Sequence, residues 1–195
     1  LEAVEEALTI GRDAGCPVQI SHLKVQGGSN WDKIEPLFEM IETDSTQRGN
    51  VHFDRYPYVA YSTGLSNLFP TWSREGGRFL ERLTDASLED EIKTYVVNKV
   101  NTLGSWNSVM VSRARAEEDQ KYAGWRMDEI AADKNTDPYD ETVAMLMRNG
   151  GSVGMVGFGM GEENTKRILS HPLGMICSDG SAMTTEGRGS PHPRN

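Results

Sequence analysis

Near its end the chain reads Gly174-Met175-Ile176-Cys177-Ser178-Asp179-Gly180. A short apolar run here brings one carboxylate, that of Asp179, to the point where a strand would end, and a flexible glycine follows at once. In an α/β barrel catalytic groups sit at this point, because the loops that leave the carboxyl ends of the strands build the active site. The run therefore predicts a strand and makes Asp179 a candidate catalytic residue.

A second stretch of the same kind lies far upstream, and it reads Pro17-Val18-Gln19-Ile20-Ser21-His22-Leu23-Lys24. Another short apolar run ends there in an imidazole, with an ammonium two residues later. Taken alone, a histidine at a strand end or an aspartate in a Ser-Asp-Gly turn is more often structural. Because His22 and Asp179 both follow strands, we expect them at one mouth of the fold. That pairing favours a metal-assisted hydrolase.

Strand-like runs alternate with helical patterns along the chain. Further strands are expected at residues 51–56, 107–111 and 153–158. The spacing of Ile34, Leu37, Phe38 and Ile41 predicts one apolar face of a helix. Alternating strands and helices indicate a parallel sheet with crossover helices, and continuous apolar strands indicate that both faces are covered. A complete (β/α)8 barrel needs ~250 residues, so we predict the later part of a TIM-type barrel, with an open doubly wound sheet as the alternative.

Local signals place some element ends. Ser29 with Asp32, and Ser87 with Asp90, have the spacing of capping boxes at helix starts. Asp137 before a proline also predicts a helix start. Residues 63–77, rich in turn formers and aromatic residues, are expected to form a loop with a short helical turn.

Composition bounds the class of protein. The chain has 195 residues and a formal net charge of -9, which argues against a nucleic-acid partner. No apolar run approaches the ~20 residues that span a bilayer, so no membrane partner is expected. The two cysteines, Cys16 and Cys177, are interpreted as buried free thiols that serve the core. No pair of histidines or cysteines has the spacing of a self-contained zinc motif.

Both ends of the sequence suggest a larger protein. Residue 1 already belongs to an amphipathic helical pattern, and residue 195 lies in a loop. We therefore expect residues 1–195 to be one internal piece of a catalytic barrel. A cytoplasmic location is expected, and the oligomeric state is left open.

Several motifs, in a fixed order, resemble the N-acyl-D-amino-acid deacylases (D-aminoacylases) of the amidohydrolase superfamily. They are Gln19-Ile20-Ser21-His22-Leu23-Lys24, Asp54-Arg55-Tyr56-Pro57-Tyr58, Ser62-Thr63-Gly64-Leu65, Phe69-Pro70-Thr71-Trp72, Glu75-Gly76-Gly77, His171-Pro172, Ser178-Asp179-Gly180 and Pro191-His192-Pro193-Arg194. The resemblance covers nearly the whole chain. It implies a (β/α)8 barrel with zinc at its mouth and a small N-acyl amino acid as substrate.

The resemblance also implies roles for single residues. His22 would be a zinc ligand, and Asp179 would act first as general base and then as general acid. Lys24 would hold the substrate carboxylate, and Tyr56 would assist in binding that carboxylate or the amide. Further substrate contacts are expected from Arg74 and Arg194. The family's other ligands, which are a His-x-His pair, a bridging cysteine and another histidine, would lie upstream of residue 1, so this piece alone is expected to be inactive.

The expected chemistry agrees with these roles. An amide is a poor electrophile, so its hydrolysis gains from a zinc ion and from a carboxylate that moves a proton to the departing nitrogen. Two other functions stay open. One is a hydrolase of cyclic amides, related to dihydropyrimidinase or dihydroorotase; the other is a non-catalytic binding protein on the same barrel.

Overall fold

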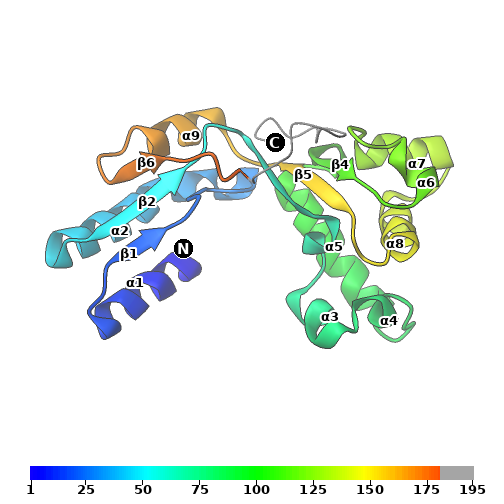
Figure 1. Ribbon diagram of the computed structural model, residues 1–195, viewed down its shortest axis with the longest axis horizontal. Helices are drawn as coiled ribbons and strands as arrows, with labels where there is room; N and C mark the ends of the chain where they lie inside the picture. The colour runs from blue at the N-terminus through cyan, green and yellow to red at the C-terminus, as the bar shows by residue number, and fades with distance from the viewer. Residues whose placement is uncertain (181–195) are drawn as a thin grey trace. The chain divides into compact units, whose positions relative to one another are not determined.

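The structure is a computed structural model, and it describes residues 1–180. The chain divides into two compact units, and each is described by itself (Figure 1). The first unit contains residues 1–59 and residues 160–180; the second contains residues 60–159. The chain therefore leaves the first unit after its second strand and returns to it about a hundred residues later.

The first unit is built on a parallel sheet in which β2 lies between β1 and β6. The strands are β1 (Val18–Ile20), β2 (Val51–Arg55) and β6 (Gly174–Ile176). The helices are α1 (Glu2–Ala14), the 3-10 turn η1 (Gly28–Lys33), α2 (Ile34–Arg48) and α9 (Glu162–Leu169). Helix α1 packs on β1 and α2, and α9 packs on β2 and β6 (Figure 1).

The core of the first unit lies between this sheet and its helices. As predicted, α2 buries one face, and the side chains on it are Ile34, Leu37, Phe38 and Ile41. Helix α1 approaches β1 so closely that a Cβ on Gly11 would lie 2.2 Å from Cγ2 of Val18. It ends at Gly15, whose φ of 62° is a left-handed conformation that glycine adopts without strain.

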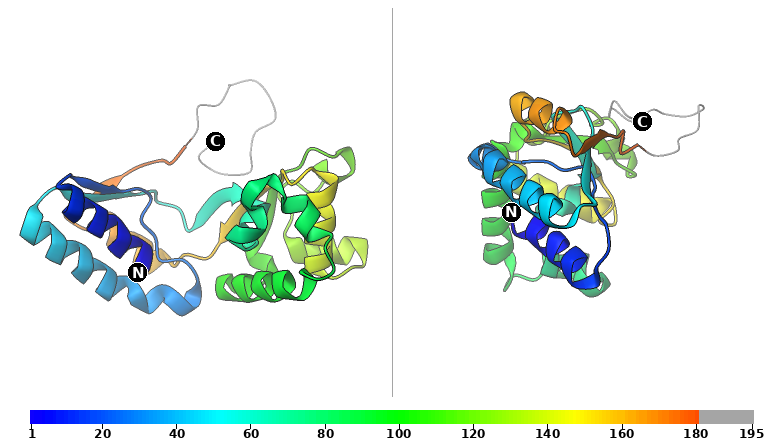
Figure 2. Two further views of the ribbon diagram at one scale, coloured as in Figure 1. Left: turned by 90° about the horizontal axis from the view of Figure 1, so that it is seen from below. Right: turned by 90° about the vertical axis from the view of Figure 1, so that its left-hand side faces the viewer.

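The second unit is built on an antiparallel sheet in which β5 lies between β3 and β4. The strands are β3 (Ala60–Gly64), β4 (Val109–Arg113) and β5 (Gly154–Phe158). The α-helices are α3 (Thr71–Arg74), α4 (Phe79–Leu83), α5 (Glu89–Leu103), α6 (Glu117–Gln120), α7 (Met127–Lys134) and α8 (Pro138–Arg148). The 3-10 turns are η2 (Leu65–Leu68), η3 (Glu75–Gly77) and η4 (Trp106–Ser108). The ribbon of this unit is shown in Figure 2. Its apolar core includes side chains of the sheet and of helices α5, α7 and α8.

The structure shows a mixed α/β chain with a parallel sheet and helices, as the sequence predicted. The prediction that all strands run parallel is wrong for the second unit, whose strand pairs are antiparallel. Strand β3 was also missed, since residues 63–77 were expected to begin as a loop. Its Tyr61, Ser62 and Thr63 carry no apolar run, and the strand is only partly buried. The predicted strands at 51–56, 107–111 and 153–158 are confirmed by β2, β4 and β5, within a few residues.

Two of the three predicted helix caps are wrong. Ser29 lies inside η1, and α2 begins at Ile34 without a capping side chain. Helix α5 likewise follows Leu88, whose side chain cannot cap it. Asp137 does cap α8: its Oδ1 accepts a hydrogen bond from the Tyr139 backbone N at 3.0 Å.

The cysteines are both free, as expected, but they do not fill the core. Cys16 is exposed, and Cys177 is half-buried and lies just beyond β6. The core interpretation is therefore wrong for both. Across residues 1–180, no helix combines the length and the apolar character that a bilayer crossing requires.

Candidate active site at the carboxyl edge of the parallel sheet

The three strands of the first unit point their carboxyl ends to one edge, because all of them run parallel. The register fixes this alignment: Ile20 of β1 is the partner of Phe53 of β2, and Arg55 of β2 is the partner of Ile176 of β6. His22 follows β1 by two residues, and Asp179 follows β6 by three. The structure thus brings the predicted imidazole and the predicted carboxylate to the same edge of one sheet.

Both residues have an unusual backbone. His22 has a φ of 45° and Asp179 a φ of 48°, in the left-handed region. Within residues 1–180 the other non-glycine residues with positive φ are Asn50 and Asn135, and asparagine tolerates this region well. Histidine and aspartate, like asparagine, occur in this region more often than most residue types do. Each of the two predicted site residues therefore leaves the extended conformation just beyond the end of a strand.

Asp54, on the middle strand, contacts the turn after β1 and the segment after β6. Its Oδ1 accepts a hydrogen bond from the backbone N of His22 at 2.6 Å, and its Oδ2 accepts one from Nε2 of Gln19 at 2.9 Å. The Cys177 thiol donates to the same carboxylate. Burial alone would raise the pKa of Asp54, but these hydrogen bonds, with that from His22 first, outweigh it and lower the pKa. Asp54 is therefore an ionised acceptor at neutral pH.

Lys24 lies next to His22, as the Ser-His-x-Lys spacing predicted. Its Nζ is 2.9 Å from Nδ1 of His22 and 5.6 Å from the ring centre of Tyr56. An ammonium only donates hydrogen bonds, so Nδ1 of His22 is the acceptor in this contact. A metal ion bound through Nδ1 would displace Lys24 from this nitrogen.

Tyr56 follows β2 at the same edge, and its ring is fully buried. The guanidinium carbon of Arg55 lies 4.3 Å from the centre of the Tyr56 ring, and Nζ of Lys24 lies 5.6 Å from it. The structure thus places three predicted residues, His22, Lys24 and Tyr56, in one cluster of contacts. A substrate can reach the Tyr56 ring only if one of the side chains that cover it moves.

Arg74 belongs to the second unit, where it ends α3. Its Nε is buried, with no acceptor among residues 1–180. Burial, and then the positive charge of Arg74, lower the pKa of the Lys99 ammonium. The predicted contact of Arg74 with a substrate stays a prediction. Arg194, the other predicted substrate contact, lies outside the described residues.

The donor atoms at the edge suit zinc in kind but do not complete a site. Imidazole nitrogen and carboxylate oxygen are both common zinc ligands. In the part of the chain that the structure describes, no three His, Cys, Asp or Glu side chains are grouped to hold a metal ion. Burial, and then the hydrogen bond to Asp54, raise the pKa of Cys177 to about 11, so this thiol stays protonated at neutral pH and is a poor ligand. His22 thus fits one position of a zinc site, and Asp179 is a carboxylate at the same edge that is not needed as a ligand.

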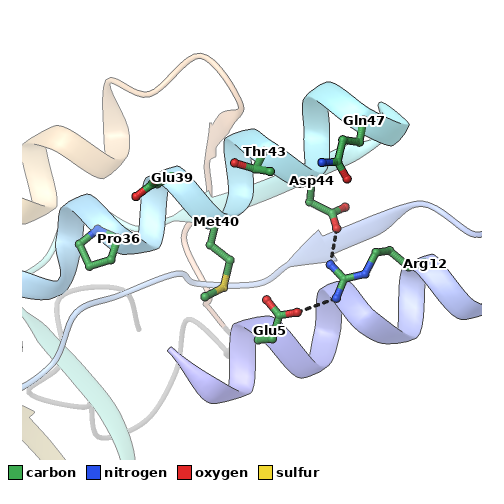
Figure 3. A pocket seen from close by; sticks show the side chains of 8 residues that line it. All are labelled: Glu5, Arg12, Pro36, Glu39, Met40, Thr43, Asp44 and Gln47. Atoms are coloured by element: carbon green, nitrogen blue, oxygen red, sulfur yellow. Dashed lines mark hydrogen bonds and ion pairs between the residues drawn. The ribbon is translucent and has the colours of Figure 1, made fainter.

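A separate cavity of about 360 Å³ lies between α1 and α2 (Figure 3). Arg12 bridges it: one guanidinium nitrogen lies 2.6 Å from Glu5, and the other lies 2.6 Å from Asp44. Asp44, which is 3% exposed, also pairs with Arg48. None of the predicted site residues lines this cavity. We interpret its charged groups as a structural clamp between the two helices.

The sequence motifs contain Asp54 but assign it no role. The available signal is a carboxylate one residue before the strand ends, on the face that it shares with exposed His52. That the carboxylate contacts two neighbouring strand ends depends on the strand order, and this order cannot be read from one strand.

Curated relatives match nearly the whole chain. D-aminoacylase of Alcaligenes xylosoxydans xylosoxydans is 29% identical over 192 residues, and N-acyl-D-aspartate deacylase of the same organism is 29% identical over 193. Each match covers 98% of this chain but only 30% of the relative. The chain thus spans under a third of the length of these relatives. No protein-family model matches it.

Solved structures similar to this chain are also N-acyl-D-amino-acid deacylases. The crystal structure of N-acyl-D-glutamate deacylase from Bordetella bronchiseptica, complexed with zinc and a phosphonate that mimics the tetrahedral intermediate, superposes with a TM-score of 0.64 at 26% identity. A D-aminoacylase with a binuclear metal centre superposes with a TM-score of 0.63 at 27% identity. Each match covers 92% of this chain and 29% of the other. Over nearly its whole length, then, this chain is similar to one segment of the N-acyl-D-amino-acid deacylases, and the resemblance seen in its motifs is confirmed.

Proposed function

We propose that the protein containing this chain uses zinc to hydrolyse the amide bond of N-acyl-D-amino acids, releasing a carboxylate and a D-amino acid. The observation that carries the proposal is the position of His22 and Asp179 beyond the carboxyl ends of two strands, β1 and β6, of one parallel sheet. Relatives named as D-aminoacylase and N-acyl-D-aspartate deacylase, which match 98% of the chain, support the choice of substrate class.

We propose further that residues 1–195 are part of a (β/α)8 barrel. The parallel order β1-β2-β6, with α1, α2 and α9 packed on it, supports this fold. Since β2 and β6 are neighbours in the sheet, residues 60–159 would be an insertion between two adjacent barrel strands. His22 and Asp179 would then lie on the face of the barrel where active sites form.

The site residues of this chain have separate roles in the proposed reaction. Asp179 takes a proton from the attacking water and passes it to the departing nitrogen. The ammonium of Lys24, next to His22, holds the substrate carboxylate, and Tyr56 contributes a contact on the same side. Arg74 and Arg194 are further contacts for an anionic substrate. His22 and other groups of the whole protein hold the zinc, which supplies Lewis acidity when bound.

The test is an assay of the full-length protein with N-acetyl-D-amino acids, their L forms and a cyclic amide, together with its zinc content. Turnover of the D forms with bound zinc supports the proposal. Turnover of the cyclic amide alone would favour a dihydropyrimidinase-like hydrolase, and bound substrate without turnover would favour a binding protein. Either result would reject the deacylase proposal.

A cytoplasmic location also stays a prediction, and cell fractionation tests it.

A further inference from the structure

One carboxylate of the first unit contacts both neighbouring strands. Asp54 is the last residue but one of β2, the middle strand, and its register partner on β6 is Met175. From the middle of the sheet a side chain can reach a neighbour on either side. Asp54 accepts a hydrogen bond from the residue predicted to hold zinc, and another from the thiol two residues before the predicted acid–base group.

On the β1 side, Asp54 restrains two successive backbone groups. Its Oδ1 accepts from the N–H of His22 at 2.6 Å, and its own carbonyl oxygen accepts from the N–H of Leu23 at 2.8 Å. These bonds hold the turn in which His22 has a φ of 45°. Two successive N–H groups bound to one residue restrain the backbone from which the imidazole projects. The direction of the imidazole therefore depends on Asp54.

On the β6 side, the thiol of Cys177 donates to the carboxylate, and the backbone N of Cys177 donates to the carbonyl of Arg55 at 3.1 Å. The next residue but one is Asp179, with a φ of 48°. The segment that ends in Asp179 is thus anchored to β2 by a side-chain contact as well as by the ladder. One carboxylate anchors both halves of the candidate site.

We propose that Asp54 is a positioning residue that sets the geometry of the zinc ligand and of the acid–base group. This inference rests on the proposed function and adds to it a residue to which no role in the reaction was assigned. Oδ1 accepts from His22 and Oδ2 from Gln19, so both oxygens serve protein donors. The role that we assign to Asp54 is to act through these neighbours.

The experiment compares three variants of the full-length protein. Asp54→Ala removes the anchor. Asp54→Asn keeps one oxygen that can accept from the His22 N–H and loses the second oxygen, which accepts from Gln19. Asp44→Asn is the matched control, because it removes a buried carboxylate of the same unit that holds Arg12 and Arg48, away from the sheet edge. Three quantities are measured: the zinc Kd by competition with a chromophoric chelator, the Tm, and the exchange of backbone amides in residues 19–24.

Groups that orient metal ligands typically change metal affinity 10- to 100-fold when removed. We expect Asp54→Ala to raise the zinc Kd roughly 10- to 100-fold and to speed amide exchange at residues 22 and 23. Asp54→Asn should lie between Asp54→Ala and the wild type. Asp44→Asn should lower the Tm yet leave the zinc Kd within about twofold, since a purely structural loss does not turn the imidazole.

Equal zinc Kd values in Asp54→Ala and the wild type would overturn the inference. The inference would also be overturned if Asp44→Asn raised the zinc Kd as much as Asp54→Ala does, at an equal loss of Tm. If Asp54→Ala does not fold, the comparison of Asp54→Asn with Asp44→Asn decides. A wild type that binds zinc but hydrolyses no N-acyl-D-amino acid would reject the proposed function alone. In a wild type that binds no zinc, unchanged amide exchange in Asp54→Ala would still overturn the anchor.

Discussion

The two units of this chain use carboxylates in opposite ways. In the second unit Asp119 is fully buried, and it accepts hydrogen bonds from Arg148 at 2.8 Å and from Asn149 at 2.7 Å. In the first unit Asp179 is exposed and lies beyond a strand end, with a φ of 48°. A buried carboxylate with several hydrogen-bond donors links neighbouring elements, but it is closed to proton exchange with water. An exposed carboxylate at the edge of a sheet can exchange protons. This difference distinguishes a structural carboxylate, Asp119, from a candidate catalytic one, Asp179.

In the second unit, several charged side chains contact one another around the buried carboxylate of Asp119. Arg148 also contacts Glu141 at 2.5 Å, and Lys134 lies 3.7 Å from Asp119. Burial alone would raise the pKa of Asp119, but the hydrogen bonds from Arg148 and Asn149 outweigh it and lower the pKa. The same contacts, with the bond to Asp119 first, raise the pKa of Arg148. The cluster ties α6, α7 and α8 together and has the character of a structural support.

The largest effect is expected at the open edge. Asp179→Asn in the full-length protein should lower kcat roughly 10²- to 10⁴-fold, because the amide cannot move a proton. Zinc content and Tm should stay close to wild type, since the side chain keeps its shape and lies on the surface. The measurements are steady-state kinetics, metal analysis and thermal unfolding. Unchanged turnover would remove Asp179 from the mechanism.

The next effect is a loss of stability in the second unit. Asp119→Ala leaves Arg148 and Asn149 with a missing partner in the interior, and breaking a buried ion pair costs about 3–5 kcal/mol. The matched control is Glu118→Ala, which removes an exposed carboxylate 3.6 Å from Arg148 and should change stability by less than about 1 kcal/mol. Urea unfolding measures both. Equal losses in the two variants would contradict the contrast between buried and exposed pairs.

A smaller effect is expected on substrate binding. Lys24→Ala should raise KM roughly 10-fold for a substrate with a free carboxylate, because a hydrogen bond to a charged group is lost, and much less for its amidated analogue. Lys33→Ala is the control: it removes an exposed lysine of the same unit that contacts Asn30 and lies away from the site. If free and amidated substrates respond alike to Lys24→Ala, then Lys24 has a structural role.

The smallest effect is expected with pH, at the clamp between α1 and α2. Burial alone would raise the pKa of Asp44, but hydrogen bonds from Arg48 and Arg12 outweigh it, so the pKa is lower in the folded state. Such a carboxylate stabilises the fold above its unfolded pKa of about 4, and this contribution is lost as the pH falls through the folded pKa. Urea unfolding from pH 6 down to pH 3 should therefore show a steeper loss in the wild type than in Asp44→Asn. Parallel curves would show that Asp44 makes no such contribution.

Much of the candidate site could be predicted from single stretches of sequence. A strand end can be recognised locally, since an apolar run followed by a polar residue and a glycine is a pattern of neighbours. His22 and Asp179 were found in this way. Asp54 was overlooked because its meaning depends on which strands lie beside β2, and β6 is more than a hundred residues away. The antiparallel direction of the strands in the second unit was mispredicted because direction, too, depends on which distant strands pair.

The sequence by itself determined where short strands and amphipathic helices form, which side chains end those strands, and which deacylases the chain resembles. These properties follow from the spacing of apolar side chains and from short motifs, and both are local. Only the tertiary structure decided that β2 lies between β1 and β6, that β5 pairs antiparallel with β3 and β4, and that one carboxylate contacts the segments that follow two neighbouring strands. Strand order and direction depend on contacts between distant segments, and such contacts leave no periodic pattern in any single segment.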